Sequence, residues 1–268
     1  MSGPAVDVIS RFGAVEDDQR YTRLVELFAD DAVYYDPFFG PQRGKDAIAD
    51  FMGEMEKFVP GSGARFDSWE SVGDVDCGWA KWLMVAPNAA GEEVPVPGQS
   101  LYRLRDGLVT RVVDYLDPQA YQRLRGDEAR TPDLAGAAGA LRDESAGGGA
   151  ALDLVHRFWE IQESKRYTDL AELFTDDAVF ADMVAGTFEG KEAVTGFLAE
   201  AERKLAGTES HFELVDAAGD DTVAWSQWIY KLPGGDVPGW TLHRVRDGRF
   251  TLDEDYFDTV LAATLPRD

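Results

Sequence analysis

Cysteine and histidine are scarce in this sequence, and their scarcity excludes several kinds of site. Cys77 is the only cysteine among the 268 residues, so the chain cannot form an intrachain disulfide. The three histidines, His156, His211 and His243, are not spaced like metal ligands. We therefore predict that the protein binds no metal. The sequence also lacks a local motif typical of a Ser–His–Asp nucleophile and a glycine-rich phosphate loop.

Basic residues are few as well, since 26 lysines and arginines stand against 50 aspartates and glutamates, for a formal net charge of −24. A surface this negative repels phosphate backbones and anionic lipid head groups. We therefore expect no nucleic-acid partner and no membrane partner. No stretch approaches the ~20 apolar residues of a membrane span, and the N-terminus lacks the basic and apolar segments of a secretory signal. A cytoplasmic protein is expected.

What the sequence does contain is a long internal repeat. Residues 9–48 superpose on residues 155–194 at an offset of 146, and 18 of the 40 pairs are identical. A period of this length is that of a whole domain and not of a solenoid repeat. The stretch between the copies is rich in glycine and alanine, a composition typical of a flexible tether. We predict a first domain over residues 1–125, a linker over 126–148 and a second domain over 149–268.

Each copy shows the same order of periodic segments. In the first copy, apolar residues at helical spacing predict helices around residues 9–15, 24–28 and 48–59, and a strand over 32–36 ends before Pro37. Alternating residues predict further strands over 64–72, 77–86, 94–105 and 108–117. Asp106-Gly107 and its counterpart Asp247-Gly248 are typical of hairpin turns of the primed type. The predicted fold class is α+β, with two tandem cone-shaped domains, each a curved mixed or antiparallel sheet wrapped over three helices.

The segment from Leu27 to Asp50 carries a recognisable pattern. It reads Leu-Phe-Ala-Asp-Asp-Ala-Val-Tyr-Tyr-Asp-Pro, followed later by Gly-Lys-Asp-Ala-Ile. This resembles the nuclear transport factor 2-like superfamily, especially its SnoaL-like and ketosteroid-isomerase-like branches, over both domains. The resemblance implies a fold that hosts isomerases, cyclases, epoxide hydrolases and non-catalytic binders. Because members commonly dimerise through the back of the sheet, it also implies that the two domains pair within the chain or that the chain forms a homo-oligomer.

The resemblance implies catalytic roles for four aspartates. In the isomerase branch the aspartate at the end of the first strand is the general base, a position held by Asp36 and Asp182. The last strand of each copy resembles that of limonene epoxide hydrolases, in which the aspartate matching Asp114 and Asp255 helps to activate water. The residues alone leave other roles open. Asp36 and Asp182 are also typical of turns at strand ends, and Asp114 and Asp255 are also typical of rim charges or ion-pair partners of Arg103 and Arg244.

Further positions are predicted to bind substrate. The chain resembles fused epoxide-opening cyclases of the polyether type, whose second acid would here be Asp67 or Glu213, although a solvated strand face is the alternative. The oxyanion-hole tyrosine of ketosteroid isomerases is replaced by Phe12 and Phe158, and the later acid falls near Ser100 and Thr241, so steroid isomerisation itself is not expected. The predicted substrate-binding residues are Phe12, Tyr34, Phe38, Asp67, Trp82, Phe158, Phe180, Glu213 and Trp228.

Paired carboxyls in an apolar pocket suggest a reaction class. Burial and a neighbouring charge drive two carboxyls to different protonation states, so that one serves as acid and the other as base without any cofactor. We therefore expect a cofactor-independent isomerase, cyclase or epoxide hydrolase. Its substrate would be a small apolar carbonyl or epoxide compound such as a polyketide, terpene or steroid-like molecule. The alternative is a non-catalytic small-molecule-binding or scaffolding protein of the same fold.

Overall fold

The computed structural model describes residues 4–73, 75–126, 133, 136 and 146–264. The chain divides into two compact units, residues 1–140 and 141–268, and each is described here by itself. Most of the predicted linker over residues 126–148 lies outside the described residues. Among the described helices, none is both long and apolar enough to cross a membrane. The predicted pairing of the two domains stays a prediction.

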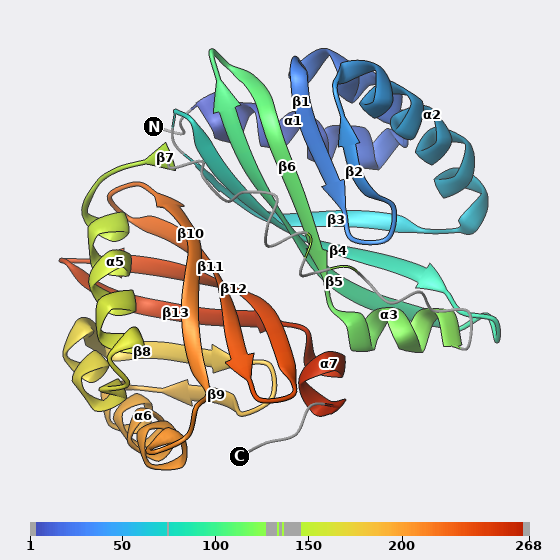
Figure 1. Ribbon diagram of the computed structural model, residues 1–268. Helices are drawn as coiled ribbons and strands as arrows, with labels where there is room; N and C mark the ends of the chain where they lie inside the picture. The colour runs from blue at the N-terminus through green and yellow to red at the C-terminus, as the bar shows by residue number, and fades with distance from the viewer. Residues whose placement is uncertain (1–3, 74, 127–132, 134–135, 137–145, 265–268) are drawn as a thin grey trace. The chain divides into compact units, whose positions relative to one another are not determined.

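The first unit is a curved six-stranded sheet with helices against one face (Figure 1). Its strands lie in the order β2-β1-β6-β5-β4-β3, and all neighbours are antiparallel except β1 and β6, which are parallel. In chain order the elements are α1 (Pro4–Asp18), the 3-10 helix η1 (Tyr21–Leu27), β1 (Phe28–Asp36), β2 (Gly40–Arg43), α2 (Lys45–Ser62), β3 (Arg65–Gly73), β4 (Cys77–Pro87), β5 (Glu93–Arg105), β6 (Leu108–Leu116) and α3 (Pro118–Arg125).

The core of this unit lies between the helices and one face of the sheet. Ile9 and Phe12 of α1 and Ile48 of α2 are buried in one cluster with Trp82 of β4 and Val112 of β6. The helical spacing of the apolar residues on α1 and α2 and the alternation along the strands therefore meet in one apolar layer.

The second unit repeats this architecture with one additional short strand. Its sheet order is β7-β10-β11-β12-β13-β8-β9, with β8 and β13 parallel. The elements are β7 (Ala146–Gly147), α5 (Ala150–Glu163), η3 (Tyr167–Leu173), β8 (Phe174–Asp182), β9 (Gly186–Glu189), α6 (Lys191–Leu205), β10 (His211–Gly219), β11 (Val223–Leu232), β12 (Gly235–Arg246), β13 (Arg249–Phe257) and α7 (Thr259–Thr264).

The predicted fold class and the tandem repeat are confirmed, and the elements differ from the prediction at several points, which include the short strand β7 and the helix α7. Phe28, predicted to end a helix, begins β1 instead. The short strands β2 and β9 were not predicted, because four residues are too few for a visible alternation. The helix α3 was also not predicted. It begins because the Asp117 carboxylate accepts hydrogen bonds from the backbone N–H groups of Gln119 (2.8 Å) and Ala120 (3.2 Å).

The two Asp-Gly turns have the backbone conformation that the sequence predicts. Asp106 and Gly107 both have positive φ values, 54° and 77°, and Asp247 and Gly248 repeat this with 54° and 70°. Positive φ at both central residues is the signature of a type I′ hairpin. The turns therefore set the starting register of the hairpins β5–β6 and β12–β13 (Arg105 opposite Leu108, Arg246 opposite Arg249).

Candidate functional site

In the first unit, Asp114 of β6 is held by hydroxyl groups from two other strands. Its Oδ1 accepts a hydrogen bond from the Ser100 hydroxyl of β5 at 2.6 Å, and its Oδ2 accepts one from the Tyr34 hydroxyl of β1. Ser100 in turn accepts a hydrogen bond from the indole N–H of Trp82 on β4 at 3.0 Å. Four strands thus contribute to one connected network centred on a carboxylate.

A β-bulge places Ser100 opposite Asp114. The hairpin register runs from Arg105 opposite Leu108 to Leu104 opposite Val109, and then continues with Arg103 opposite Arg111. Thr110 is therefore an extra residue, and its hydroxyl donates to the Arg103 carbonyl at 3.3 Å. Without the bulge, the alternation from the turn would place Ser100 opposite residue 113 and not opposite Asp114.

Burial perturbs the Asp114 carboxyl strongly. Removal of solvent raises its pKa from 3.8 to about 7, even though the hydrogen bonds from Ser100 and Tyr34 favour the ionised form. The negative charge of Asp36 contributes to this rise in the Asp114 pKa and also raises the pKa of the Tyr34 hydroxyl. Asp36 therefore lies within electrostatic reach of Asp114, as the parallel pairing of β1 with β6 requires.

Asp36 combines two of the roles that the sequence leaves open. Its Oδ1 accepts hydrogen bonds from the backbone N–H groups of Phe38 (2.7 Å) and Phe39 (3.0 Å), which is the turn arrangement typical of an aspartate at a strand end. The side chain is half-buried, and burial raises the pKa of its carboxyl despite these hydrogen bonds. A turn-forming aspartate is thus also a perturbed acid next to Asp114.

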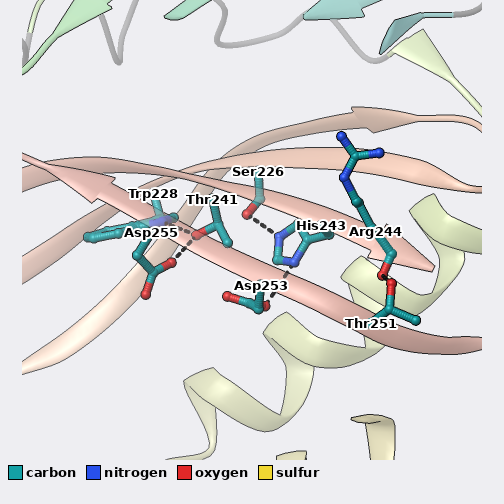
Figure 2. A network of polar contacts seen from close by, with 8 residues as sticks. All are labelled: Ser226, Trp228, Thr241, His243, Arg244, Thr251, Asp253 and Asp255. Atoms are coloured by element: carbon teal, nitrogen blue, oxygen red, sulfur yellow. Dashed lines mark hydrogen bonds and ion pairs between the residues drawn. The ribbon is translucent and has the colours of Figure 1, made fainter. Parts of the chain in front are cut away.

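The second unit repeats the central part of this network (Figure 2). The Thr241 hydroxyl donates to Asp255 at 2.5 Å and accepts from the Trp228 indole N–H at 2.8 Å. A bulge at Thr251 corresponds to that at Thr110, and its hydroxyl donates to the Arg244 carbonyl at 3.3 Å. Burial raises the pKa of Asp255 well above its ordinary value, and the charges of Asp253 and Asp182 raise it further.

The two networks differ in the number of hydroxyl donors. At the position of Tyr34 the second copy has Phe180, which is buried against Phe174 and Phe197. Asp255 therefore lacks the tyrosine hydroxyl that Asp114 has. Asp182 forms the same turn as Asp36, accepting from the N–H groups of Val184 (2.7 Å) and Ala185 (2.6 Å).

A second polar network in this unit was not foreseen from the sequence. The Ser226 hydroxyl lies 2.9 Å from Nε2 of His243, and Nδ1 of His243 lies 3.0 Å from Oδ2 of Asp253; Figure 2 shows the three side chains in a row. All three side chains are fully buried. The sequence contains no local Ser–His–Asp motif because the three residues come from β11, β12 and β13 and meet only in the sheet. The alternation of His243 with Thr241 and of Asp253 with Asp255 is the one signal that could have placed them on a common face.

The remaining predicted binding residues are aromatic residues, described first, and two acidic residues at the surface. Phe12 and Phe158 each lie in the core of their unit. The ring of Phe12 packs edge-on against Tyr102 of β5, with 5.2 Å between ring centroids. The ring of Phe158 packs in the same way against His243 of β12, at 5.7 Å. Phe38 is half-buried and stacks on Tyr121 of α3 at 4.2 Å.

Asp67 and Glu213 occupy a different environment from the buried aspartates. Both side chains are exposed, and Glu213 lies 3.6 Å from Nζ of Lys231 and 3.7 Å from Nε2 of His211. The structure therefore brings Asp36, Tyr34, Trp82 and Asp114 together and leaves Asp67 and Glu213 at the surface.

Comparisons with known proteins agree with the repeat. A family model described as the SnoaL-like domain matches residues 9–112 and again residues 155–252. No curated protein matches the chain. Solved structures with a similar fold include a protein of unknown function from Mesorhizobium loti, described as NTF2-like (22% identity, 43% of this chain and 99% of that chain, TM-score 0.38). A protein described as a putative polyketide cyclase, from Silicibacter sp., is 19% identical over 44% of this chain and 92% of that one (TM-score 0.37). TerC, co-crystallised with polyporic acid, is 20% identical over 46% and 98% (TM-score 0.39).

Proposed function

Because the chain belongs to the SnoaL-like domain family, with one domain of that family in each half, we propose that it is a cofactor-independent acid–base enzyme. Its reaction would be an isomerisation, a cyclisation or the opening of an epoxide. Its substrate would be a small, largely apolar carbonyl or epoxide compound such as a polyketide, a terpene or a steroid-like molecule.

The observation that carries this proposal is the state of Asp114. A carboxyl with a pKa of about 7 is present in both protonation states at neutral pH. General acid–base catalysis is most effective when the pKa of the catalytic group lies near the working pH, and such a group typically contributes ~10²–10⁴-fold in rate. Asp114 as a residue is only partly buried, and the proposal requires that a ligand reaches its carboxyl.

The two carboxyls of the first domain divide the chemistry between them. The charge of Asp36 raises the pKa of Asp114, and in the proposed mechanism Asp36 serves as the base, while protonated Asp114 serves as the acid. Asp114 donates its proton to the carbonyl or epoxide oxygen, and Asp36 removes a proton from carbon or holds an attacking water. The hydroxyls of Ser100 and Tyr34 then stabilise the carboxylate that Asp114 becomes.

Aromatic rings around the carboxyls support an apolar substrate. The ring of Phe51 lies 5.4 Å from that of Tyr34 and 5.6 Å from that of Phe39. Phe39 is exposed. Phe38 and Tyr121 form a stacked pair beside the turn that Asp36 closes. Rings of this kind bind planar apolar molecules by area burial and offset stacking, and they keep the carboxyls poorly solvated.

Substitution of the two acids tests the proposal. Turnover of a panel of cyclic ketones and epoxides by the full chain would be compared with that of Asp114→Asn and Asp36→Asn, and we expect each variant to lose ~10²-fold or more in kcat. Binding measured by calorimetry should remain, because the amide keeps the shape of the side chain. Asp31→Asn is the matched control, because Asp31 lies on the same strand but is exposed and paired with Arg105 at 2.7 Å. Full activity of Asp114→Asn would refute the acid–base role.

A second candidate function is non-catalytic binding of the same class of molecule. One observation favours it, namely that Oδ1 of Asp36 is already occupied by two backbone N–H groups and Asp182 repeats that turn. Exchange of substrate protons with D₂O, followed by mass spectrometry, separates the two functions. An isomerase or cyclase catalyses exchange at the carbon next to the carbonyl, and exchange is lost in Asp36→Asn; an epoxide-opening enzyme instead converts the epoxide, which changes the mass of the compound or its retention time. A binder protects the compound and catalyses no exchange.

A further inference from the structure

The buried network of Ser226, His243 and Asp253 has the order of groups of a nucleophilic triad, but its location excludes that role. None of the three side chains has accessible surface, with exposed fractions of 0% for each. A nucleophile must touch the substrate, and the Ser226 hydroxyl is covered on the inner face of β11. The ring of His243 is further enclosed by Phe158 (5.7 Å) and Phe250 (5.2 Å).

The hydrogen bonds of the network indicate where its charge lies. Ser226 has one hydroxyl proton, and the nearest acceptor that the geometry provides is Nε2 of His243 at 2.9 Å. If Ser226 donates to Nε2, the imidazole is neutral and its proton is on Nδ1, which donates to Oδ2 of Asp253 at 3.0 Å. Every polar proton of Ser226 and His243 is then used, and the negative charge stays on Asp253. The other oxygen of Asp253, Oδ1, is buried without a hydrogen-bond partner among the described residues, so the His243 N–H is the donor that this network supplies to the Asp253 carboxylate.

The location of Asp253 connects this charge to the candidate site. Asp253 and Asp255 are two residues apart on β13, so both side chains point to the same face of the sheet, and Figure 2 shows them on the same side. Their partners on β12, His243 and Thr241, face that side too. We propose that the buried His243–Asp253 pair is a positioning device for Asp255, fixing a negative charge beside it and thereby restricting the Asp255 carboxyl to the role of a proton donor.

The other groups that act on Asp255 are consistent with this role. Burial and the charges of Asp253, Asp182 and Glu254 all raise its pKa, and the hydrogen bond from Thr241 alone lowers it. Glu254 lies between the two aspartates in the sequence, so its side chain points to the opposite face of β13. Asp182 is the counterpart of Asp36, which acts on Asp114 in the same way.

The first domain lacks the device, and the difference separates the chemistry of the two sites. The positions of Ser226, His243 and Asp253 are held there by Ala80, Tyr102 and Val112, at matching registers of the sheet. Asp114 thus has two hydroxyl donors and no acid two residues before it, whereas Asp255 has one donor and a buried acid. This inference rests on the proposed function, and it predicts that Asp114 rests in both protonation states at neutral pH, whereas Asp255 rests protonated, donates that proton to the substrate and regains one from solvent or substrate before the next turnover.

Titration of Asp255 in the full chain tests the inference without any substrate. The side-chain carboxyl of Asp255 would be followed by ¹³C NMR in the wild type, in Asp253→Asn, which keeps the shape and removes the charge, and in Glu254→Gln as the matched control. We expect the pKa of Asp255 to fall by about one pH unit or more in Asp253→Asn and by clearly less in Glu254→Gln. The pKa of Asp114 should stay near 7 in both variants, because the side chains that act on Asp114 are Ser100, Tyr34 and Asp36.

A second variant covers the case in which Asp253→Asn does not fold. The triple variant Ser226→Ala, His243→Tyr, Asp253→Val installs the set that the first domain already packs, where Tyr102 contacts Phe12 as His243 contacts Phe158. The triple variant should also lower the Asp255 pKa. In the wild type, ¹⁵N NMR should show His243 neutral with its proton on Nδ1. An unchanged Asp255 titration in both charge-removing variants overturns the inference. A lowered pKa without turnover of any compound overturns the proposed function and leaves the charge effect standing.

Discussion

Asp114→Asn should stabilise the protein at alkaline pH while abolishing the proposed chemistry. In the folded chain the Asp114 carboxyl has a pKa of about 7, against 3.8 when unperturbed. The folded state therefore holds the proton more tightly than the unfolded state does. The stabilisation from the protonated carboxyl is complete below about pH 4 and is lost as the pH rises through 7.

The structure sets the size of the effect. The difference between 3.8 and about 7, at 1.36 kcal/mol per pH unit, corresponds to roughly 4 kcal/mol between pH 4 and pH 8. Asparagine has no charge to bury; its amide oxygen can accept one of the two hydrogen bonds that Ser100 and Tyr34 donate to Asp114, and its NH2 group can donate to the other hydroxyl oxygen. The unfolding free energy of Asp114→Asn relative to wild type should therefore increase by up to ~4 kcal/mol across this range.

Urea unfolding of the full chain at pH 4, 6 and 8, followed by tryptophan fluorescence, measures this difference. Asp31→Asn is the control with the opposite sign, because the hydrogen bond from Arg105 lowers the pKa of Asp31. The stabilisation by Asp31 is present at neutral pH and lost as the pH falls, and it is small because both side chains are exposed. If the difference between Asp114→Asn and wild type is the same at all three pH values, the reasoning about the buried carboxyl is wrong.

Three further predictions concern the networks around Asp114 and Asp255. Tyr34→Phe removes the hydroxyl that donates to Asp114, so the Asp114 pKa should rise by about one unit; an unchanged NMR titration would contradict this. Phe180→Tyr supplies the missing hydroxyl to the second domain, and the Asp255 pKa should fall, with a rise or no change as the opposing result. Gly98→Ala places a Cβ in steric overlap with the Trp82 ring, so we expect about 1–3 kcal/mol of destabilisation and altered tryptophan fluorescence. Gly53→Ala in α2, where nothing lies within 4 Å, should be neutral or stabilising; equal losses in both variants would refute the packing argument.

Much of the fold could be predicted because it is encoded in local patterns. The identical pairs between residues 9–48 and 155–194 indicate two domains, and the Asp-Gly turns fix where each last hairpin begins. The helical spacing of the apolar residues on α1 and α2 correctly indicates which face is buried. The strands β2 and β9 escaped notice because they are only four residues long.

The candidate site was predicted only in part, because its key contacts depend on register. The sequence indicates Asp114 and Asp255 as candidates, whereas it marks Ser100 and Thr241 only as positions where an expected acid is missing. Their hydroxyls reach the carboxyls because of the bulges at Thr110 and Thr251. A one-residue shift of register reverses the face of every side chain, and nothing in the local sequence shows that a threonine will be the extra residue.

The sequence by itself determined that this protein has two copies of one α+β domain, an acidic surface, and an aspartate at the end of each first strand. Only the tertiary structure decided which carboxyls are perturbed. The pKa of Asp114 depends on burial and on hydroxyls from β1 and β5, and the charge next to Asp255 depends on a histidine and an aspartate from adjacent strands. Residue types and their spacing are local properties of the chain. Solvation and electrostatic interaction depend on distances between residues far apart in the sequence, which folding alone sets.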